Sequence, residues 1–137
     1  MRKTIILFGL IFLSVQTHNM LVVNNRIFKE ISKWEILIES LIQVESRGNN
    51  YISSGNSLGC LQITPIYVRE VNNILGYNKY SLDDRKSKSK SIEMFNIIQI
   101  QNNPTKNISK AIRLHNPNAK QYYFNKVYKQ MKLLSNL

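Results

Sequence analysis

Hydrophobic and polar positions follow one another along this chain with the spacing of an α-helix. After residue 23, segments with an apolar residue every three or four positions are separated by polar stretches rich in Asn, Ser, Gly and Pro. Such spacing predicts helices, and no stretch has the sustained two-residue alternation of a strand. We therefore expect a mainly α fold, a single domain of about five helices, at residues 28–45, 65–75, 91–101, 108–114 and 119–134.

The polar stretches mark where these helices begin and end. Gly48 and the two asparagines after it tolerate the left-handed backbone that commonly closes a helix. Residues 49–63 are rich in Asn, Ser and Gly, which predicts a loop or a short hairpin. Thr64 and Pro65 have the pattern of an N-cap followed by proline at the first helical position. The polar residues 76–90 are expected to form a surface connection.

The charge of the chain is unusual, although its composition is otherwise that of a globular protein. Of its 137 residues 43% are hydrophobic and 20% charged, but 19 Lys and Arg stand against 8 Asp and Glu, for a net charge of +11. No acidic residue follows Glu93. A field of this sign attracts polyanions such as nucleic acid, anionic lipid or an acidic cell wall. The same charges would also suit solvated helix faces, so they limit the class of partner and no more.

The cysteine and histidine content argues against a disulfide bond and against a metal site. Cys60 is the only cysteine, which excludes an intramolecular disulfide and a thiolate metal cluster. Because the chain also has only two His residues, a zinc site is not expected, and neither is any other metal or cofactor. Cys60 is most simply a small buried side chain. Stability is expected to come from packing alone.

The amino-terminal residues have the layout of a secretory leader. Arg2 and Lys3 precede an apolar run from Ile5 to Val15, and a polar segment follows it. That run is too short to span a bilayer comfortably, and the layout predicts a signal peptide over residues 1–19 and a domain over residues 24–137. A buried N-terminal helix is the alternative. We expect an exported protein of the periplasm, the cell wall or the extracellular space, with no stable membrane insertion once the leader is removed.

One carboxylate of the first helix is expected to point inward. Successive helical residues are rotated by about 100°, so Glu45 returns to within about 20° of the direction of Trp34, along with Leu37 and Leu41. Glu35 and Glu39 lie roughly 100° and 140° away, on the wetter side. Burial and the negative end of the helix dipole should raise the pKa of Glu45, which suits a general acid. The alternative is a structural ion pair with Arg47 or with a lysine of the basic carboxyl-terminal part.

Two segments around this glutamate resemble a known family. Glu45-Ser46 closes the first helix, and thirteen residues later the chain reads Gly-Cys-Leu-Gln-Ile-Thr-Pro from Gly59 to Pro65. This pairing is similar to the lytic transglycosylase module of the lysozyme-like superfamily. Residues 111–116, Ala-Ile-Arg-Leu-His-Asn, resemble the family's Ala-x-x-x-aromatic-Asn turn, and residues 123–127 resemble its Tyr-Val-x-x-Val segment. The resemblance extends over about residues 34–130.

The resemblance implies a lysozyme-like fold and a role for each matching residue. Glu45 takes the position of the catalytic glutamate, and the implied substrate-binding residues are Ser46, Gln62, His115, Asn116 and Tyr123, with Ser46 also supporting the glutamate. The chain departs from the family at His115, where Tyr or Trp is usual, and at the two residues after Asn116, where glycines are usual. His115 could still donate a hydrogen bond to Glu45, but it is expected to titrate near neutral pH.

The expected activity follows from the single inward carboxyl group. Glycoside hydrolysis ordinarily needs two carboxylates, and no second acid is clearly placed opposite Glu45. The sequence therefore resembles a lytic transglycosylase that cleaves the MurNAc-GlcNAc β-1,4 bond of peptidoglycan and leaves a 1,6-anhydro product. The alternatives are a hydrolytic lysozyme that uses Asp83 or Asp84, and a noncatalytic basic protein that binds the cell wall. Nucleic acid is not an expected partner of an exported chain, whereas service to an envelope-spanning machine stays open.

Overall fold

The computed structural model describes residues 33–136. The predicted leader, and the part of the first predicted helix before residue 33, lie outside the described residues. The chain divides after Trp34, and the fold described is that of the second unit, Glu35–Leu137. Among residues 33–136 no helix has both the length and the apolar character that a membrane span requires.

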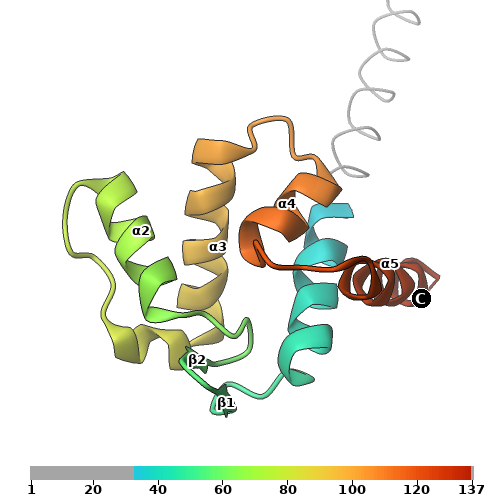
Figure 1. The fold of residues 1–137 in the computed structure, drawn as a ribbon, viewed down its shortest axis with the longest axis horizontal. Helices are drawn as coiled ribbons and strands as arrows, with labels where there is room; N and C mark the ends of the chain where they lie inside the picture. Colours follow the sequence, from blue (N-terminus) through green and yellow to red (C-terminus); the bar gives the residue numbers. More distant parts are fainter. Residues whose placement is uncertain (1–32, 137) are drawn as a thin grey trace, which may run out of the picture. The chain divides into compact units, whose positions relative to one another are not determined.

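The second unit is mainly α, as the hydrophobic spacing predicts. Residues 33–46 are helical. The elements that follow are β1 (Ser53–Ser54), β2 (Ser57–Leu58), α2 (Pro65–Leu75), the 3-10 helix η1 (Leu82–Lys86), α3 (Lys88–Asn102), α4 (Ile108–His115) and α5 (Gln121–Ser135) (Figure 1). The two short strands pair antiparallel, with Ser53 opposite Leu58. The predicted hairpin between the first two helices is thus confirmed.

The boundaries of α2 agree with the capping signals in the sequence. The Thr64 hydroxyl accepts a hydrogen bond from the Tyr67 backbone N–H at 3.2 Å, and Pro65 occupies the first turn. At the other end Gly76 has a φ of 77°, and its N–H bonds to the carbonyl of Asn72 at 2.9 Å. The positive φ is the reason that the helix ends at a glycine.

The segment predicted as a surface connection, residues 76–90, is more ordered than expected. It contains η1, and α3 begins at Lys88 rather than at the predicted Ser91, because the Ser87 hydroxyl accepts a hydrogen bond from the Lys90 N–H. A side-chain cap therefore starts the helix before its first buried residue. The predicted bounds of α4 and α5 differ from the observed ones by only one or two residues at an end.

The core lies around α3, which has α2 on one side and α4 on the other (Figure 1). Phe95 and Met94 of α3 are fully buried, as are Leu37 and Leu41 of the first helix. Cys60 is also fully buried, as expected of a small apolar side chain. The other apolar side chains of residues 33–136 with an exposed fraction of 2% or less are Ile42, Leu61, Ile63, Val68, Val71, Ala111, Ile112 and Val127.

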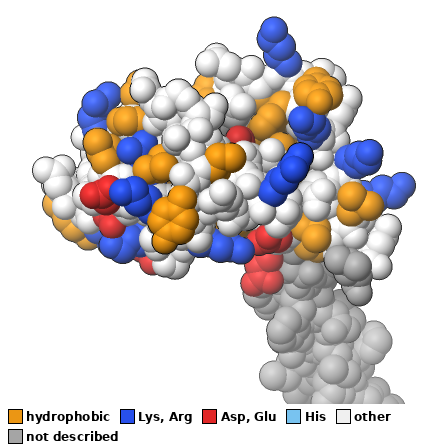
Figure 2. All heavy atoms as spheres, turned by 90° about the horizontal axis from the view of Figure 1, so that it is seen from below, with side chains coloured by type: hydrophobic (Ala, Val, Ile, Leu, Met, Phe, Trp, Pro, Cys, Tyr) orange, Lys and Arg blue, Asp and Glu red, His pale blue; other side chains and the backbone are white. Residues whose placement is uncertain are grey.

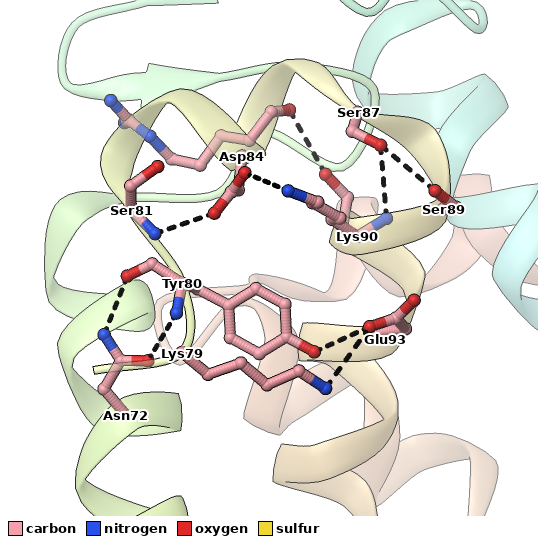
Figure 3. A network of polar contacts seen from close by, with 11 residues as sticks. Asn72, Lys79, Tyr80, Ser81, Asp84, Ser87, Ser89, Lys90 and Glu93 are labelled. Atoms are coloured by element: carbon pink, nitrogen blue, oxygen red, sulfur yellow. Dashed lines mark hydrogen bonds and ion pairs between the residues drawn. The ribbon is translucent and has the colours of Figure 1, made fainter. Parts of the chain in front are cut away.

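Polar contacts fix the segment between α2 and α3 (Figure 3). The Asn72 side chain donates to the Tyr80 carbonyl at 2.8 Å and accepts from the Tyr80 N–H at 3.0 Å. The Tyr80 hydroxyl in turn donates to Glu93 of α3 at 2.8 Å. The Asp84 carboxylate accepts from the Ser81 N–H at 2.8 Å and pairs with Lys90 at 2.6 Å. These contacts hold η1 against the start of α3.

Candidate active site

Glu45 lies in the last turn of the first helix, with its side chain 18% exposed. The hydroxyl of Tyr123 in α5 donates a hydrogen bond to Glu45 Oε1. Burial raises the pKa of Glu45, and the hydrogen bond from Tyr123 acts in the opposite direction. Glu35 is exposed and Glu39 pairs with Lys88 at 3.0 Å, so the predicted orientation of the three glutamates is confirmed.

The predicted alternative, a structural ion pair between Glu45 and Arg47 or a lysine, is wrong within residues 33–136. In that range the nearest cationic candidate is the imidazole of His115, whose Nε2 lies 3.7 Å from Glu45 Oε1. That distance is too long for a hydrogen bond. Glu45 is therefore held by a neutral donor, Tyr123, rather than by a fixed cation.

A cleft of about 620 Å³ opens beside Glu45. The first helix, the turn after β2 and helices α2 and α3 contribute to its walls, together with the end of α4 and the residues after it. The residues with polar side chains on these walls include Glu45, Gln62, Tyr67, Glu70, Arg113, His115 and Asn116. The carboxyl group predicted to be an acid thus lies in a hollow large enough for part of a polymeric ligand.

The turn that carries Gln62 is tied to the helix that carries Glu45. The Ser46 hydroxyl donates to the Cys60 carbonyl at 2.8 Å and also contacts the Ile42 carbonyl at 3.1 Å. Gln62 has a φ of 48°, and its side-chain amide donates to the carbonyls of Gly59 at 2.8 Å and Ile52 at 3.0 Å. Ser46 is buried and is not among the residues that line the cleft, so it supports the turn rather than facing a ligand.

Gly59 and Arg85 join this turn to η1. Gly59 has a φ of 85°, and a Cβ placed on it would lie 1.8 Å from the Arg85 carbonyl oxygen. The buried guanidinium group of Arg85 donates to the carbonyls of Asn56 at 3.0 Å and Ile63 at 3.2 Å. The Ser91 hydroxyl donates to the Arg85 carbonyl at 3.2 Å. The segment expected to be a surface connection therefore supports the cleft.

His115 is neutral, which corrects the expectation that it titrates near neutral pH. Its side chain is 3% exposed, and burial lowers its pKa to about 4. The ring lies edge-on to Tyr67 and Phe95, with ring centroids 6.0 Å and 5.7 Å apart. At 3.7 Å its Nε2 does not make the anticipated hydrogen bond to Glu45.

The other predicted site residues divide into two groups. Gln62, His115 and Asn116 line the cleft with Glu45, whereas Tyr123 contacts Glu45 without being part of the lining. Asp83 and Asp84, the acids proposed for a hydrolytic alternative, are outside the lining. They pair with Lys86 and Lys90, which holds the pKa of each carboxyl below its usual value.

The residues of the cleft that the sequence did not indicate include Tyr67 and Glu70 of α2. Ile66, Tyr67 and Glu70 share one face of that helix, because residues three and four apart are neighbours on a helix surface. The same rotation count that selected Glu45 would have grouped them, but it could not tell that this face borders the cleft. The Tyr67 hydroxyl is buried without a hydrogen-bond partner among residues 33–136, and burial raises its pKa.

Among residues 33–136 no group of three or more His, Cys, Asp or Glu side chains is placed to hold a metal ion. The cleft contains the Glu45 carboxyl group, whose protonated form burial favours and which accepts a hydrogen bond from the Tyr123 hydroxyl. Comparison of the chain with family models, with curated proteins and with solved structures finds no match. The residues of the cleft, and the resemblance of the segments around them to the transglycosylase motifs, are therefore what indicates a function.

Proposed function

We propose that the chain is a peptidoglycan lytic transglycosylase that acts on the MurNAc-GlcNAc β-1,4 bond, with Glu45 as its acid and base. The observation that carries the proposal is the Glu45 carboxyl group, which is mostly buried at the edge of a cleft and has a raised pKa. A buried carboxyl without a fixed cationic partner stays protonated to higher pH than an exposed one. General acid catalysis requires a group of this kind.

The reaction uses the same carboxyl group twice. Glu45 donates its proton to the glycosidic oxygen as the bond from that oxygen to C1 of the muramic sugar breaks. The carboxylate then takes the proton of the muramic 6-hydroxyl, whose oxygen forms a bond to C1. The product is a 1,6-anhydro sugar, no water is consumed, and Glu45 ends protonated. The hydrogen bond from Tyr123 favours the ionised form of Glu45 and so stabilises it between the two steps.

The surface charge supports an anionic polymer as substrate. The basic residues after Glu93 are all exposed: Lys106, Lys110, Arg113, Lys120, Lys126, Lys129 and Lys132. Figure 2 shows Lys and Arg side chains spread over the face that it displays, with fewer Asp and Glu side chains among them. We propose that this charge draws the enzyme to the acidic wall after export to the periplasm or beyond.

A hydrolytic lysozyme is the second candidate, and one observation favours it. Glu70 lines the same cleft as Glu45, whereas Asp83 and Asp84 do not. In a hydrolytic mechanism this exposed carboxylate on another wall of the cleft would be the general base that activates water. In this hydrolytic mechanism Glu70 takes the role that the sequence-based alternative gave to Asp83 or Asp84. One water molecule is added across the cleaved bond.

The test is product analysis by mass spectrometry after digestion of purified peptidoglycan. The wild type is expected to release anhydro-muropeptides, and Glu45→Gln is expected to release none. Glu39→Gln is the matched control, because Glu39 is on the same helix with its side chain 38% exposed and outside the cleft. At neutral pH the thermal midpoint of Glu45→Gln should not fall, since the substitution removes a carboxylate whose ionisation burial opposes.

The result separates the three functions. Full activity of Glu45→Gln would end both catalytic proposals, because each uses Glu45 as the acid. Binding of peptidoglycan without any cleavage by the wild type would leave the noncatalytic wall-binding protein. Products that carry one added water, formed by the wild type and lost in Glu70→Gln, would replace the transglycosylase with the hydrolase. Anhydro products formed equally by the wild type and by Glu70→Gln would exclude Glu70 as a base.

A further inference from the structure

A second concavity, of about 630 Å³, lies between α4 and α5. We call it the α4–α5 groove. Ser109, Lys110 and Arg113 of α4 line it, together with Gln121, Phe124 and Tyr128 of α5. The Ser109 and Tyr128 hydroxyls are joined by a hydrogen bond of 2.7 Å across the two helices. None of these residues has a role in the proposed reaction.

Arg113 connects this groove to the cleft, since it lines both. Its Nη1 donates to the Ala119 carbonyl at 2.6 Å, and the guanidinium carbon lies 4.8 Å from the centroid of the Phe124 ring. These two contacts hold the guanidinium group in place and leave its remaining N–H donors for other partners. The cleft and the groove therefore meet at Arg113, whose guanidinium group is held by these two contacts.

The charge of the groove is positive. Among residues 33–136 its lining includes the cations Lys110 and Arg113 and no acidic side chain. The ion pairs between Lys or Arg and Asp or Glu within residues 33–136 involve Lys79, Lys86, Lys88 and Lys90 instead. Two cations beside a pair of hydroxyl groups form a site suited to carboxylates. The ring of Phe124 adds an apolar wall for aliphatic carbons.

We propose that the α4–α5 groove binds the acidic peptide stem of peptidoglycan, an inference that rests on the proposed function. The stem leaves the glycan from the muramic sugar, which is the sugar whose bond Glu45 cleaves. A strand bound in the cleft therefore carries its peptide outward over a wall of the cleft. At the Arg113 wall that peptide meets the groove, where its carboxylates have Lys110 and Arg113 as partners. Peptide-bearing strands are then bound more tightly than bare glycan.

The experiment compares two substrates and two single-lysine variants. The substrates are intact peptidoglycan and the same glycan stripped of its peptides by an amidase. Lys110→Gln removes a charge from the groove, and Lys129→Gln removes the charge of an exposed lysine of α5 that lines neither concavity. Lys110→Gln should raise KM for intact peptidoglycan about two- to fivefold, the range that an exposed ion pair allows, and leave KM for bare glycan unchanged. Lys129→Gln removes the same unit of surface charge away from the groove, so it should not reproduce this difference between the two substrates.

A binding measurement separates this inference from the proposed function. Stem peptides released by the amidase are titrated into the full chain and followed by NMR shifts of the backbone amides of α4 and α5. The wild type and Lys129→Gln should bind them alike, and Lys110→Gln should bind them more weakly. Equal binding by Lys110→Gln and Lys129→Gln, or no binding by the wild type, would overturn the groove assignment while the cleavage proposal stands. Absence of cleavage on both substrates would overturn the proposed function itself.

Discussion

Gly59→Ala should destabilise the fold strongly, because two separate costs meet at this position. The first is conformational, since Gly59 has a φ of 85°, in the left-handed region that side chains disfavour. The second is steric, because the new Cβ would lie 1.8 Å from the carbonyl oxygen and 2.9 Å from the carbonyl carbon of Arg85. The atoms that must move are backbone atoms, so no side-chain rotation relieves the overlap.

The loss in the free energy of unfolding of Gly59→Ala can be estimated from the backbone conformation and the hydrogen bonds that the new Cβ disturbs. The left-handed conformation costs about 1–2 kcal/mol for a residue with a Cβ. Moving the Arg85 backbone strains the hydrogen bonds of its guanidinium group to Asn56 and Ile63, each of which contributes about 1 kcal/mol. The total is roughly 3–4 kcal/mol, and since each kcal/mol lowers the midpoint of a domain of this size by about 4–8 °C, the loss should exceed about 10 °C.

Gly55→Ala is the matched control, and thermal unfolding followed by circular dichroism is the assay. Gly55 also has a positive φ, 57°, but a Cβ there would meet no atom within 4 Å. Its substitution should cost only the conformational part, about 1–2 kcal/mol. Equal midpoints for the two variants would refute the claim that close approach to Arg85 requires a glycine at 59. If Gly59→Ala stays folded at low temperature, it should also lose cleavage activity, because the turn that carries Gln62 is displaced.

Two further predictions concern the groups around Glu45. Tyr123→Phe removes the hydrogen bond that favours the ionised carboxylate, so the pKa of Glu45 should rise. The basic limb of the kcat/KM profile should then move to higher pH, and the rate at the optimum should fall about tenfold. A basic limb that does not move would contradict this role of Tyr123. His115 has a pKa of about 4 in the folded chain against an ordinary 6.5, so its neutral form contributes stability above pH 6.5 that is lost as the pH falls toward 4. This amounts to roughly 3 kcal/mol, and urea unfolding at pH 7 and pH 4 should show the wild type losing more stability than His115→Gln; equal losses would mean that His115 is not buried as a neutral ring.

Local signals in the sequence were sufficient for much of the fold. Thr64, Pro65 and Gly76 act on the backbone within one or two turns, and the structure places the ends of α2 where they indicate. The orientation of Glu45 followed from rotation along a single helix, for which no knowledge of the packing is needed. The hydrophobic pattern does not indicate the start of α3 at Lys88, because Ser87 and the residues around it are polar. The helix starts there because the Ser87 hydroxyl accepts a hydrogen bond from the Lys90 N–H, which the spacing of apolar residues does not show.

The missed features depend on segments that are distant in the sequence. The burial of Arg85 requires the carbonyl groups of Asn56 and Ile63, which belong to the hairpin and to the turn after it. The low pKa of His115 requires Tyr67 and Phe95 to pack against the imidazole from two other helices. A periodicity argument assigns each residue to a face of its own helix, but it does not say which face of another helix will meet it.

Ser46 explains why the position of the carboxyl group and the shape of the cleft depend on each other. Its hydroxyl bonds back to the Ile42 carbonyl in the helix that carries Glu45, and across to the Cys60 carbonyl in the turn that leads to Gln62. The Gly48 N–H bonds to the same hydroxyl at 3.1 Å, which fixes the chain as it leaves the helix. One buried oxygen thus ties together the acid, the turn and the start of the hairpin loop. The Glu-Ser pair at this helix end therefore acts as one structural unit. Glu45 lines the cleft, and Ser46 holds the turn whose Gln62 lines the same cleft.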